Sequence, residues 1–240
     1  MVLNRFKDLG SRDVKTPSRT KLENLLLRAE SLAHQFPQQC HKYRRSIYDK
    51  SKECLDDIEY DEHDVEDFVF SLADDDFSDE QYDVLGIFSG AMLDILTRRN
   101  RKKDKETVIN IDGGGAYFPH LFSHAQNFDF VYLSNFKGKA ICDSLGSDIY
   151  KEKCLPQVGG GVVALSDIEG DFVGSSIAAN KGDVSLIVFD NIKGDDCGCG
   201  IAYEGWVGKV LLRDIEGDNV MLRCADQEHS RIDLIVYDNI

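Results

Sequence analysis

The densest group of potential metal ligands in this sequence is Asp195-Asp-Cys-Gly-Cys-Gly200. Two further cysteines, Cys142 and Cys224, fall at comparable places in a repeat described below, so neighbouring repeats could bring more thiols to it. Zinc sites usually carry paired Cys-x-x-Cys motifs, and a single Cys-x-Cys is a weak signal. We therefore expect buried thiols that fill the core, and we keep metal binding through Cys197 and Cys199 as an alternative.

Two histidines and two glycine runs also have spacings that could bind a ligand. His120 and His124 stand four residues apart, which can hold zinc on a helix, but a third ligand and the glutamate of a metalloprotease are missing. The glycine runs 113–115 and 159–161 lack the pattern of a phosphate-binding or dinucleotide-binding loop, so we expect them to form corners. The sequence therefore predicts no catalytic, cofactor-binding or metal-ligating residue.

Aspartates recur at similar places along the C-terminal half. Repetition indicates a structural role, because a catalytic carboxylate pair normally occurs once. A carbohydrate-active β-helix enzyme with a unique carboxylate pair in an acidic groove stays as an alternative. The recurring aspartates are Asp167, Asp171, Asp190, Asp195, Asp214 and Asp218.

One stretch of the repeat, residues 136–166, is about eight residues longer than its counterparts. Function tends to reside in loops on a rigid scaffold, so any site should lie in this stretch. Its polar and reactive residues are Asp143, Ser144, Asp148, Tyr150, Lys151, Lys153 and Cys154.

The repeat itself is clearest in Leu186-Ile-Val-Phe-Asp-Asn-Ile-Lys-Gly-Asp195. An apolar run precedes Asn or Asp, and Ile or Phe, a charged residue and Gly follow. A fixed period of this size is typical of a solenoid. The repeated Asn or Asp residues are Asn110, Asn135, Asp167, Asn191, Asp214 and Asn239, separated by 25, 32, 24, 23 and 25 residues.

A period of about 24 residues suits one rung of a parallel β-helix with two or three short strands. Antiparallel hairpins that share a turn sequence are the alternative. In a solenoid, the Asn and Asp residues from Asn135 to Asn239 should stack as a polar ladder at one corner. Ile168, Ile192, Ile215 and Ile240 should stack beside them and point into the core.

The N-terminal residues 20–99 show helical periodicity and predict a compact antiparallel bundle. Thr20-Lys-Leu-Glu23 and Ser78-Asp-Glu-Gln81 are capping boxes that open the first and the fourth helix. Gly86 and Gly90 lie one turn apart, which should let a neighbouring helix pack closely. The expected helices are residues 20–36, 39–58, 62–73 and 78–99.

Two resemblances accompany these patterns. Phe68 and the run Gly86-Ile-Phe-Ser-Gly-Ala-Met-Leu-Asp-Ile-Leu96 resemble a small archaeal helical domain family of unknown function, over about a third of the chain. The acidic residues 74–76 depart from it, because that family implies a shorter turn there. This resemblance implies no chemistry. The C-terminal half resembles parallel β-helix solenoids in general.

Charge is strongly segregated along the 240 residues, whose net charge is −15. Residues 53–83 hold fifteen carboxylates and no Lys or Arg, which indicates a solvated face, since neither acidic run has the Gly and distal Glu of an EF-hand. Residues 98–105 are mostly basic, which suits a helix C-terminus. A short basic run without interleaved aromatics is a weak sign of nucleic-acid binding, and the net negative charge disfavours non-specific nucleic-acid binding by the whole molecule.

The sequence has neither an apolar run long enough to span a membrane nor a secretory signal at its start. Its seven irregularly spaced cysteines do not form a disulfide framework, so we expect a cytoplasmic protein without cofactors. The expected organisation is α+β: a mobile arm 1–19, a helical domain 20–99, a basic linker 100–106 and a β-solenoid 107–240.

The last copy of the repeat, Leu234-Ile-Val-Tyr-Asp-Asn-Ile240, should leave an unpaired strand edge. Such an edge either pairs with another copy or with a protein partner, or the chain is truncated there. We therefore expect a non-enzymatic scaffold or protein-interaction module, with that edge and the long stretch 136–166 as its contact regions. The sequence does not indicate any small-molecule ligand.

Overall fold

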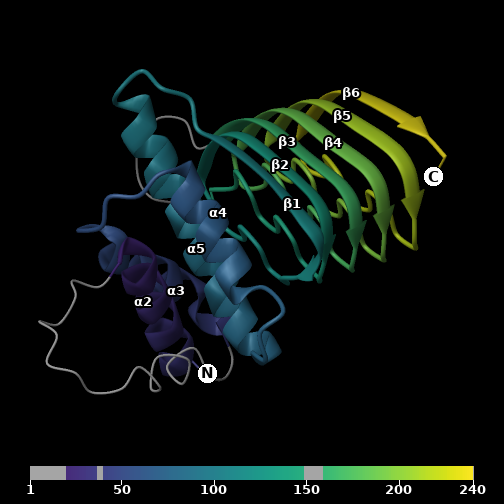
Figure 1. The fold of residues 1–240 in the computed structure, drawn as a ribbon. Coiled ribbons are helices and arrows are strands. Elements are labelled where there is room, and N and C mark those ends of the chain that lie inside the picture. Colours follow the sequence, from purple (N-terminus) through teal and green to yellow (C-terminus); the bar gives the residue numbers. More distant parts are fainter. Residues whose placement is uncertain (1–19, 37–39, 149–158, 240) are drawn as a thin grey trace, which may run out of the picture.

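The structure is a computed structural model that describes residues 20–36, 40–148 and 159–239. The arm predicted at residues 1–19 and the last isoleucine of the predicted column, Ile240, lie outside these ranges. The described residues form four helices followed by a six-stranded parallel sheet that coils into a solenoid, so the predicted α+β class is confirmed (Figure 1).

Two of the described helices begin at the capping boxes that the sequence predicts. Thr20 and Glu23 form the predicted capping box, and so do Ser78 and Gln81. A third box, formed by Asp61 and Asp64, was not predicted. None of the described helices is both long and apolar enough to cross a membrane. The helices are α2 (Lys21–Gln35), α3 (Cys40–Leu55), α4 (Glu62–Leu72) and α5 (Asp79–Arg101).

Helix α5 is buried along most of its length because it lies between the other helices and the solenoid (Figure 1). Its glycines face the solenoid, and the prediction that they admit a neighbouring helix is wrong. A Cβ on Gly86 would lie 2.1 Å from the carbonyl oxygen of His120, and one on Gly90 would lie 2.1 Å from that of Ser123. Because these two positions have no side chain, the backbone of the solenoid packs directly against the helix.

A buried carboxylate fastens the same helix to the start of a strand. Asp94 accepts hydrogen bonds from the backbone N–H of Asn127 at 3.0 Å and from the Tyr48 hydroxyl at 2.8 Å. Arg98 lies 3.2 Å from the same carboxylate. A buried charge of this kind is stable only when several donors surround it, so α3, α5 and the solenoid meet at one point.

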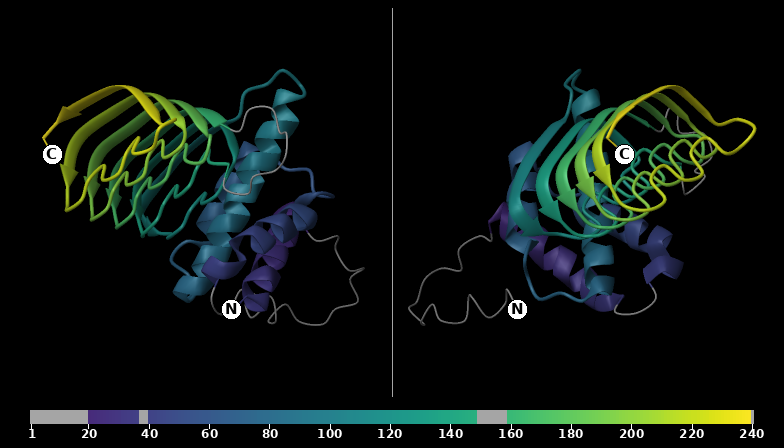
Figure 2. Two further views of the ribbon diagram at one scale, coloured as in Figure 1. Left: turned by 180° about the vertical axis from the view of Figure 1, so that it is seen from behind. Right: turned by 90° about the vertical axis from the view of Figure 1, so that its right-hand side faces the viewer.

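The six strands pair in sequence order, and every pair is parallel. This arrangement excludes the alternative of antiparallel hairpins. In its described residues each rung has a single strand and returns through turns, whereas two or three strands per rung were predicted (Figure 2). These turns form what we call the turn wall, made of residues 118–126, 138–148, 170–182, 194–205 and 217–230. The strands are β1 (Val108–Tyr117), β2 (Asn127–Lys137), β3 (Gly159–Glu169), β4 (Asp183–Lys193), β5 (Trp206–Glu216) and β6 (Arg231–Asp238).

The turn wall has a distinctive backbone. Alternate residues have positive φ, for example 58° at Ser144, 55° at Ser176 and 57° at Arg223. Its N–H groups bond to neighbouring rungs: Ser144 N donates to Ser175 O at 2.8 Å, and Ser176 N to Cys199 O at 2.7 Å. Hydrogen bonds between rungs therefore hold the wall together, although its described residues form no strand.

The sheet contributes regular columns of inward side chains. Ile168, Ile192 and Ile215 align in the strand register and are buried, which confirms this part of the predicted column. The polar ladder beside them is also confirmed, with φ of 51–55° at its members Asn135, Asp167, Asn191, Asp214 and Asn239.

The ladder extends to β1, one rung further than predicted, but it does so through Asp112 and not through Asn110, two residues earlier, where the first copy of the repeat was anchored. Asn110 pairs with Tyr132 in the register, so it does not belong to the ladder. Asp112 takes that place, and its Oδ1 accepts a hydrogen bond from Asn135 Nδ2 at 2.8 Å. The strand register is irregular between Asp112 and Ala116, and the repeat pattern alone does not reveal this irregularity.

Candidate functional site

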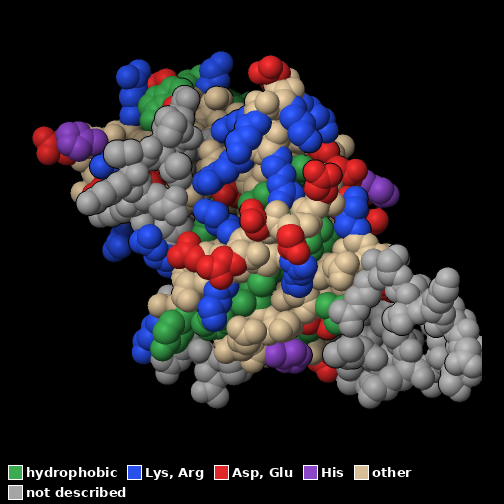
Figure 3. Space-filling view, turned by 90° about the vertical axis from the view of Figure 1, so that its left-hand side faces the viewer, with side chains coloured by type: hydrophobic (Ala, Val, Ile, Leu, Met, Phe, Trp, Pro, Cys, Tyr) green, Lys and Arg blue, Asp and Glu red, His purple; other side chains and the backbone are tan. Residues whose placement is uncertain are grey.

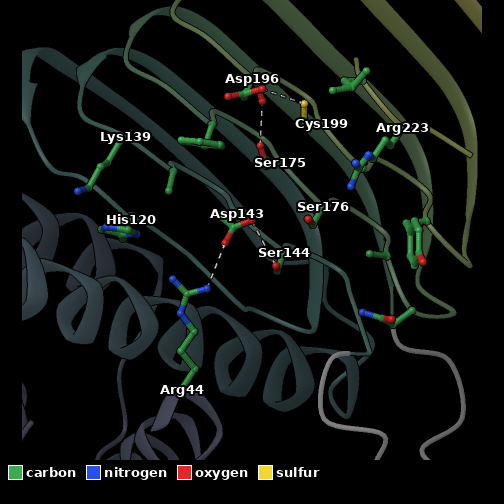
Figure 4. Close-up of a pocket in the computed structure, with 17 residues that line it drawn as sticks. Arg44, His120, Lys139, Asp143, Ser144, Ser175, Ser176, Asp196, Cys199 and Arg223 are labelled. Carbon is green, nitrogen blue, oxygen red and sulfur yellow. Dashed lines mark hydrogen bonds and ion pairs between the residues drawn. The ribbon is translucent and has the colours of Figure 1, made fainter. Parts of the chain in front are cut away.

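A groove of about 840 Å³ lies on the turn wall, where the wall faces the helices (Figure 4). Its floor is made of short side chains from successive rungs, and Arg44 of α3 reaches over one end. The groove crosses five rungs, from His120 in the first to Arg223 in the last. Successive rungs lie roughly 4.8 Å apart, so the groove extends about 19 Å along the solenoid axis.

The end of the groove beside the helices holds a cluster of charged groups. Arg44 lies 3.4 Å from Asp83 of α5 and 3.8 Å from Asp143. His120 Nδ1 lies 3.6 Å from Asp83. Burial raises the pKa of Asp143 to about 6, against the opposing effect of Arg44. Burial likewise lowers the pKa of His120, so this cluster carries its positive charge on Arg44.

The other end of the groove presents polar groups that the fold does not use. The side chains of Ser176, Asn180, Tyr203 and Arg223 all line it and are only partly covered or are exposed. Within the described part of the chain, none of the four side chains forms a hydrogen bond or an ion pair. These groups are therefore free to bind a ligand.

The predicted long stretch contributes to this site. Asp143 and Ser144 line the groove, and the Ser144 hydroxyl donates to Asp143 Oδ1 at 3.3 Å. Asp148 is half-buried and is not among the lining residues. The remaining predicted residues of that stretch, Tyr150, Lys151, Lys153 and Cys154, lie outside the described residues.

The two histidines are close to the groove but are not on a helix. His120 and His124 have φ of 62° and 65° in the first turn of the wall, so the helical geometry considered for zinc is absent. His124 is buried, and burial, helped by Arg44 and His120, lowers its pKa to about 3. His124 is therefore a neutral core residue.

The predicted thiol pair separates in the structure. Cys197 is buried and donates to the Gly194 carbonyl at 3.1 Å, whereas Cys199 lines the groove and donates to Asn219 O at 3.2 Å. Cys224 donates to Gly198 O at 3.1 Å. In the described ranges, no three His, Cys, Asp or Glu side chains gather closely enough to hold a metal ion.

The repeated aspartates have structural contacts. Asp171 accepts from the backbone N–H of Asp195 at 2.9 Å, and Asp195 accepts from that of Asp218 at 2.8 Å. Asp190 pairs with Arg213 on the outer face of the sheet. The first glycine run forms a corner as predicted, since Gly114 and Gly115 have positive φ at the irregularity in β1. The same prediction is wrong for residues 159–161, which lie in β3, where Gly160 packs against the Phe128 ring.

The basic run at the end of α5 joins parts of the fold. Arg99 donates to the carbonyl groups of Leu55 and Ile58, and Arg101 lies 2.8 Å from Asp129 of β2. Lys105 lies 2.8 Å from Glu62. On the face in Figure 3, Lys and Arg side chains lie among Asp and Glu. These pairings weaken the case for a nucleic-acid contact at this run.

The second candidate region is the β6 end of the solenoid. By register, Ile235 continues the buried column that includes Val210, and Tyr237 continues the one that includes Leu212. Ile235 is 44 % exposed and Tyr237 is 71 % exposed, because no described rung follows them. Both core columns thus end in open apolar side chains on β6, which is the last strand of the solenoid in Figure 1.

Sequence reasoning missed the groove. Arg44 lies on a surface helix far from the repeat in sequence, and nothing marks it as a partner of Asp143. Arg223 breaks a column of small residues, Ser144, Ser176 and Gly200, and that irregularity is a signal that the sequence does contain. Aligning the turns, as well as the strands, would have found it.

Comparisons of this chain with protein-family models, with curated proteins and with solved structures gave no match.

Proposed function

We propose that this protein is a scaffold or protein-interaction module, and that it associates with a second copy of itself through the β6 end of its solenoid. The observation that carries the proposal is the exposure of Ile235 and Tyr237 at the ends of two core columns. Apolar side chains in register with a core are stabilised when another rung or a partner covers them.

The opposite end of the solenoid shows what a covered end looks like. Ile109 and Ile111 of β1 occupy the same two columns and are each 1 % exposed. Helices α4 and α5 pack against β1 and β2 at that end. Helices therefore cover the β1 end of the core, whereas no described element covers the β6 end. A second copy of the protein would cover the β6 end in the same way.

The backbone of β6 favours a partner that is itself a strand. One edge of β6 pairs with β5, and among the described residues no strand pairs with the other edge. Such an edge carries N–H and C=O groups that readily accept a further strand. Two β6 strands related by a two-fold axis would run antiparallel and make one continuous sheet from two copies.

Two further features fit this role without testing it. The described cysteines, Cys54, Cys142, Cys197, Cys199 and Cys224, are free thiols, which suits the cytoplasmic location that we propose. The helical part would cap the solenoid, and its resemblance to a small archaeal helical domain family carries no activity into the proposal.

A pair of matched variants tests the proposal. Ile235→Lys places a charge in the open core column, whereas Leu234→Lys places one on the outer face of the same strand, where Leu234 is 47 % exposed. Sedimentation velocity should show that Ile235→Lys shifts the protein to monomer and that Leu234→Lys does not. Equal behaviour of both variants and the unmodified protein would contradict association through this end.

A further inference from the structure

We propose that the groove on the turn wall binds an acidic oligosaccharide, through side chains that lie on separate rungs. This inference is independent of the β6 end, because it rests on residues of the turn wall and of α3. The groove volume of about 840 Å³ is in the range of small-molecule and cofactor sites.

The backbone of the groove floor excludes the binding of a peptide by strand addition. Its N–H groups already donate to carbonyl groups of adjacent rungs, as Ser176 N does to Cys199 O and Gly200 N to Leu222 O, at 2.7 and 2.8 Å. An extended peptide is usually recognised through free backbone groups at a strand edge. Such groups are occupied here, so a ligand must be recognised by side chains.

The free side chains in the groove match the hydroxyl groups of a sugar. The Ser176 and Tyr203 hydroxyls can each donate and accept a hydrogen bond, and the Asn180 amide can do both. The exposed Phe172 ring adds an apolar surface in the same groove. Polar groups on several rungs beside a ring suit a chain of hydroxylated rings better than a compact ion.

The Arg223 guanidinium can bind an acidic ligand, and the Asp196 carboxylate, which also lines the groove, limits such a ligand to few charges. Arg223 forms no ion pair with any described residue, so its guanidinium is available to bind a carboxylate in a bidentate manner. Arg44 and Lys139 stand toward the other end, but they pair with Asp143 and Asp79. Because the chain carries a net charge of −15, a dense polyanion such as a nucleic acid is disfavoured.

Isothermal titration calorimetry on the full chain tests the proposal. The probes are tetramers of galacturonate, glucuronate and mannuronate, with a neutral glucose tetramer and inorganic tripolyphosphate for comparison. At least one uronate tetramer should bind at one site per chain, at least tenfold more tightly than the glucose tetramer. Binding of no uronate tetramer, or equal or tighter binding of tripolyphosphate, would overturn the proposal.

Two variants locate the site. Arg223→Gln removes the guanidinium at a position with φ of 57° and should weaken uronate binding at least tenfold. Lys209→Gln removes a charge that is also exposed, on the outer face of β5, and should leave binding unchanged. If both variants bind like the unmodified protein, the groove is not the site. Circular dichroism of each variant checks that the fold is retained.

Discussion

Asn191 Nδ2 donates a hydrogen bond to Asp167 Oδ1, one rung earlier, at 2.7 Å. The same relationship joins Asn135 to Asp112 at 2.8 Å and Asn239 to Asp214 at 2.9 Å. Both members of the Asn191–Asp167 pair also have positive φ, which asparagine and aspartate tolerate better than most residues. Asn and Asp therefore suit the ladder positions for two reasons: they tolerate the positive φ, and their side chains form a hydrogen bond between rungs.

Replacing Asn191 should separate these two contributions. Asn191→Ala loses the side-chain bond and strains a residue with φ of 52°, so the free energy of unfolding should fall by about 2 kcal/mol. Asn191→Gly loses only the bond and should cost about half as much. Urea unfolding measures both, and an alanine variant as stable as the glycine variant would contradict the backbone part of the argument.

A substitution in the buried isoleucine column should lower the free energy of unfolding by more than one in the ladder. Ile192 is fully buried between Ile168 and Ile215, so Ile192→Asp would place a carboxylate in the core and should cost more than about 4 kcal/mol. The neighbouring Lys193→Ala is the control, because Lys193 is exposed and its ion pair with Glu216 is worth less than about 1 kcal/mol. Thermal unfolding that left Ile192→Asp as stable as the control would show that this residue is not in the core.

The contact between α5 and the solenoid can be tested with one methyl group. Gly90→Ala raises helix propensity by about 1 kcal/mol, yet its Cβ would lie 2.1 Å from Ser123 O. We expect a net loss of about 2 kcal/mol or more, because backbone must move to admit the group. A higher melting temperature for this variant would mean that α5 does not pack so closely against the first turn.

Acid stability should depend on His124. Its pKa falls from 6.5 to about 3 on folding, so between these two pH values the side chain is protonated in the unfolded chain and neutral in the folded chain. Stability from this residue is complete above pH 6.5 and is lost as the pH falls toward 3. Between pH 7 and pH 5 the loss is about 2 kcal/mol.

The comparison of His124→Gln with the unmodified protein isolates this effect. Glutamine does not titrate, so the variant should lose about 2 kcal/mol less stability between pH 7 and pH 5. Other groups, including Asp143, titrate in both proteins and cancel in the difference. Equal pH dependence in urea unfolding at the two pH values would show that His124 is protonated in the folded state.

The strand half of each rung could be predicted because its residues repeat. Val163, Ile187 and Val210 are apolar at equivalent positions, and Asn or Asp marks the corner in each rung. The turn half could not, because its conformation depends on hydrogen bonds between rungs and accepts residues as different as Ser144 and Arg223 at one position. Gly86 and Gly90 show the same limit: the sequence indicates a close approach but does not identify the partner.

The candidate site was less predictable than the fold for a related reason. Arg44 meets Asp143 only because α5 places α3 against the turn wall, and neither residue belongs to a motif. The open columns at Ile235 and Tyr237 could be anticipated, since they follow from continuing the repeat. Features that continue the sequence repeat can thus be predicted from the sequence. Contacts between the repeats and the helices cannot.

The molar mass of the unmodified protein in solution tests the central proposal most directly. Size-exclusion chromatography with light scattering, over a range of micromolar concentrations, should give twice the 27.0 kDa mass of the chain. That result would agree with the proposed pairing of two β6 ends, which would cover Ile235 and Tyr237. A mass of one chain at every concentration would contradict self-association through the β6 end.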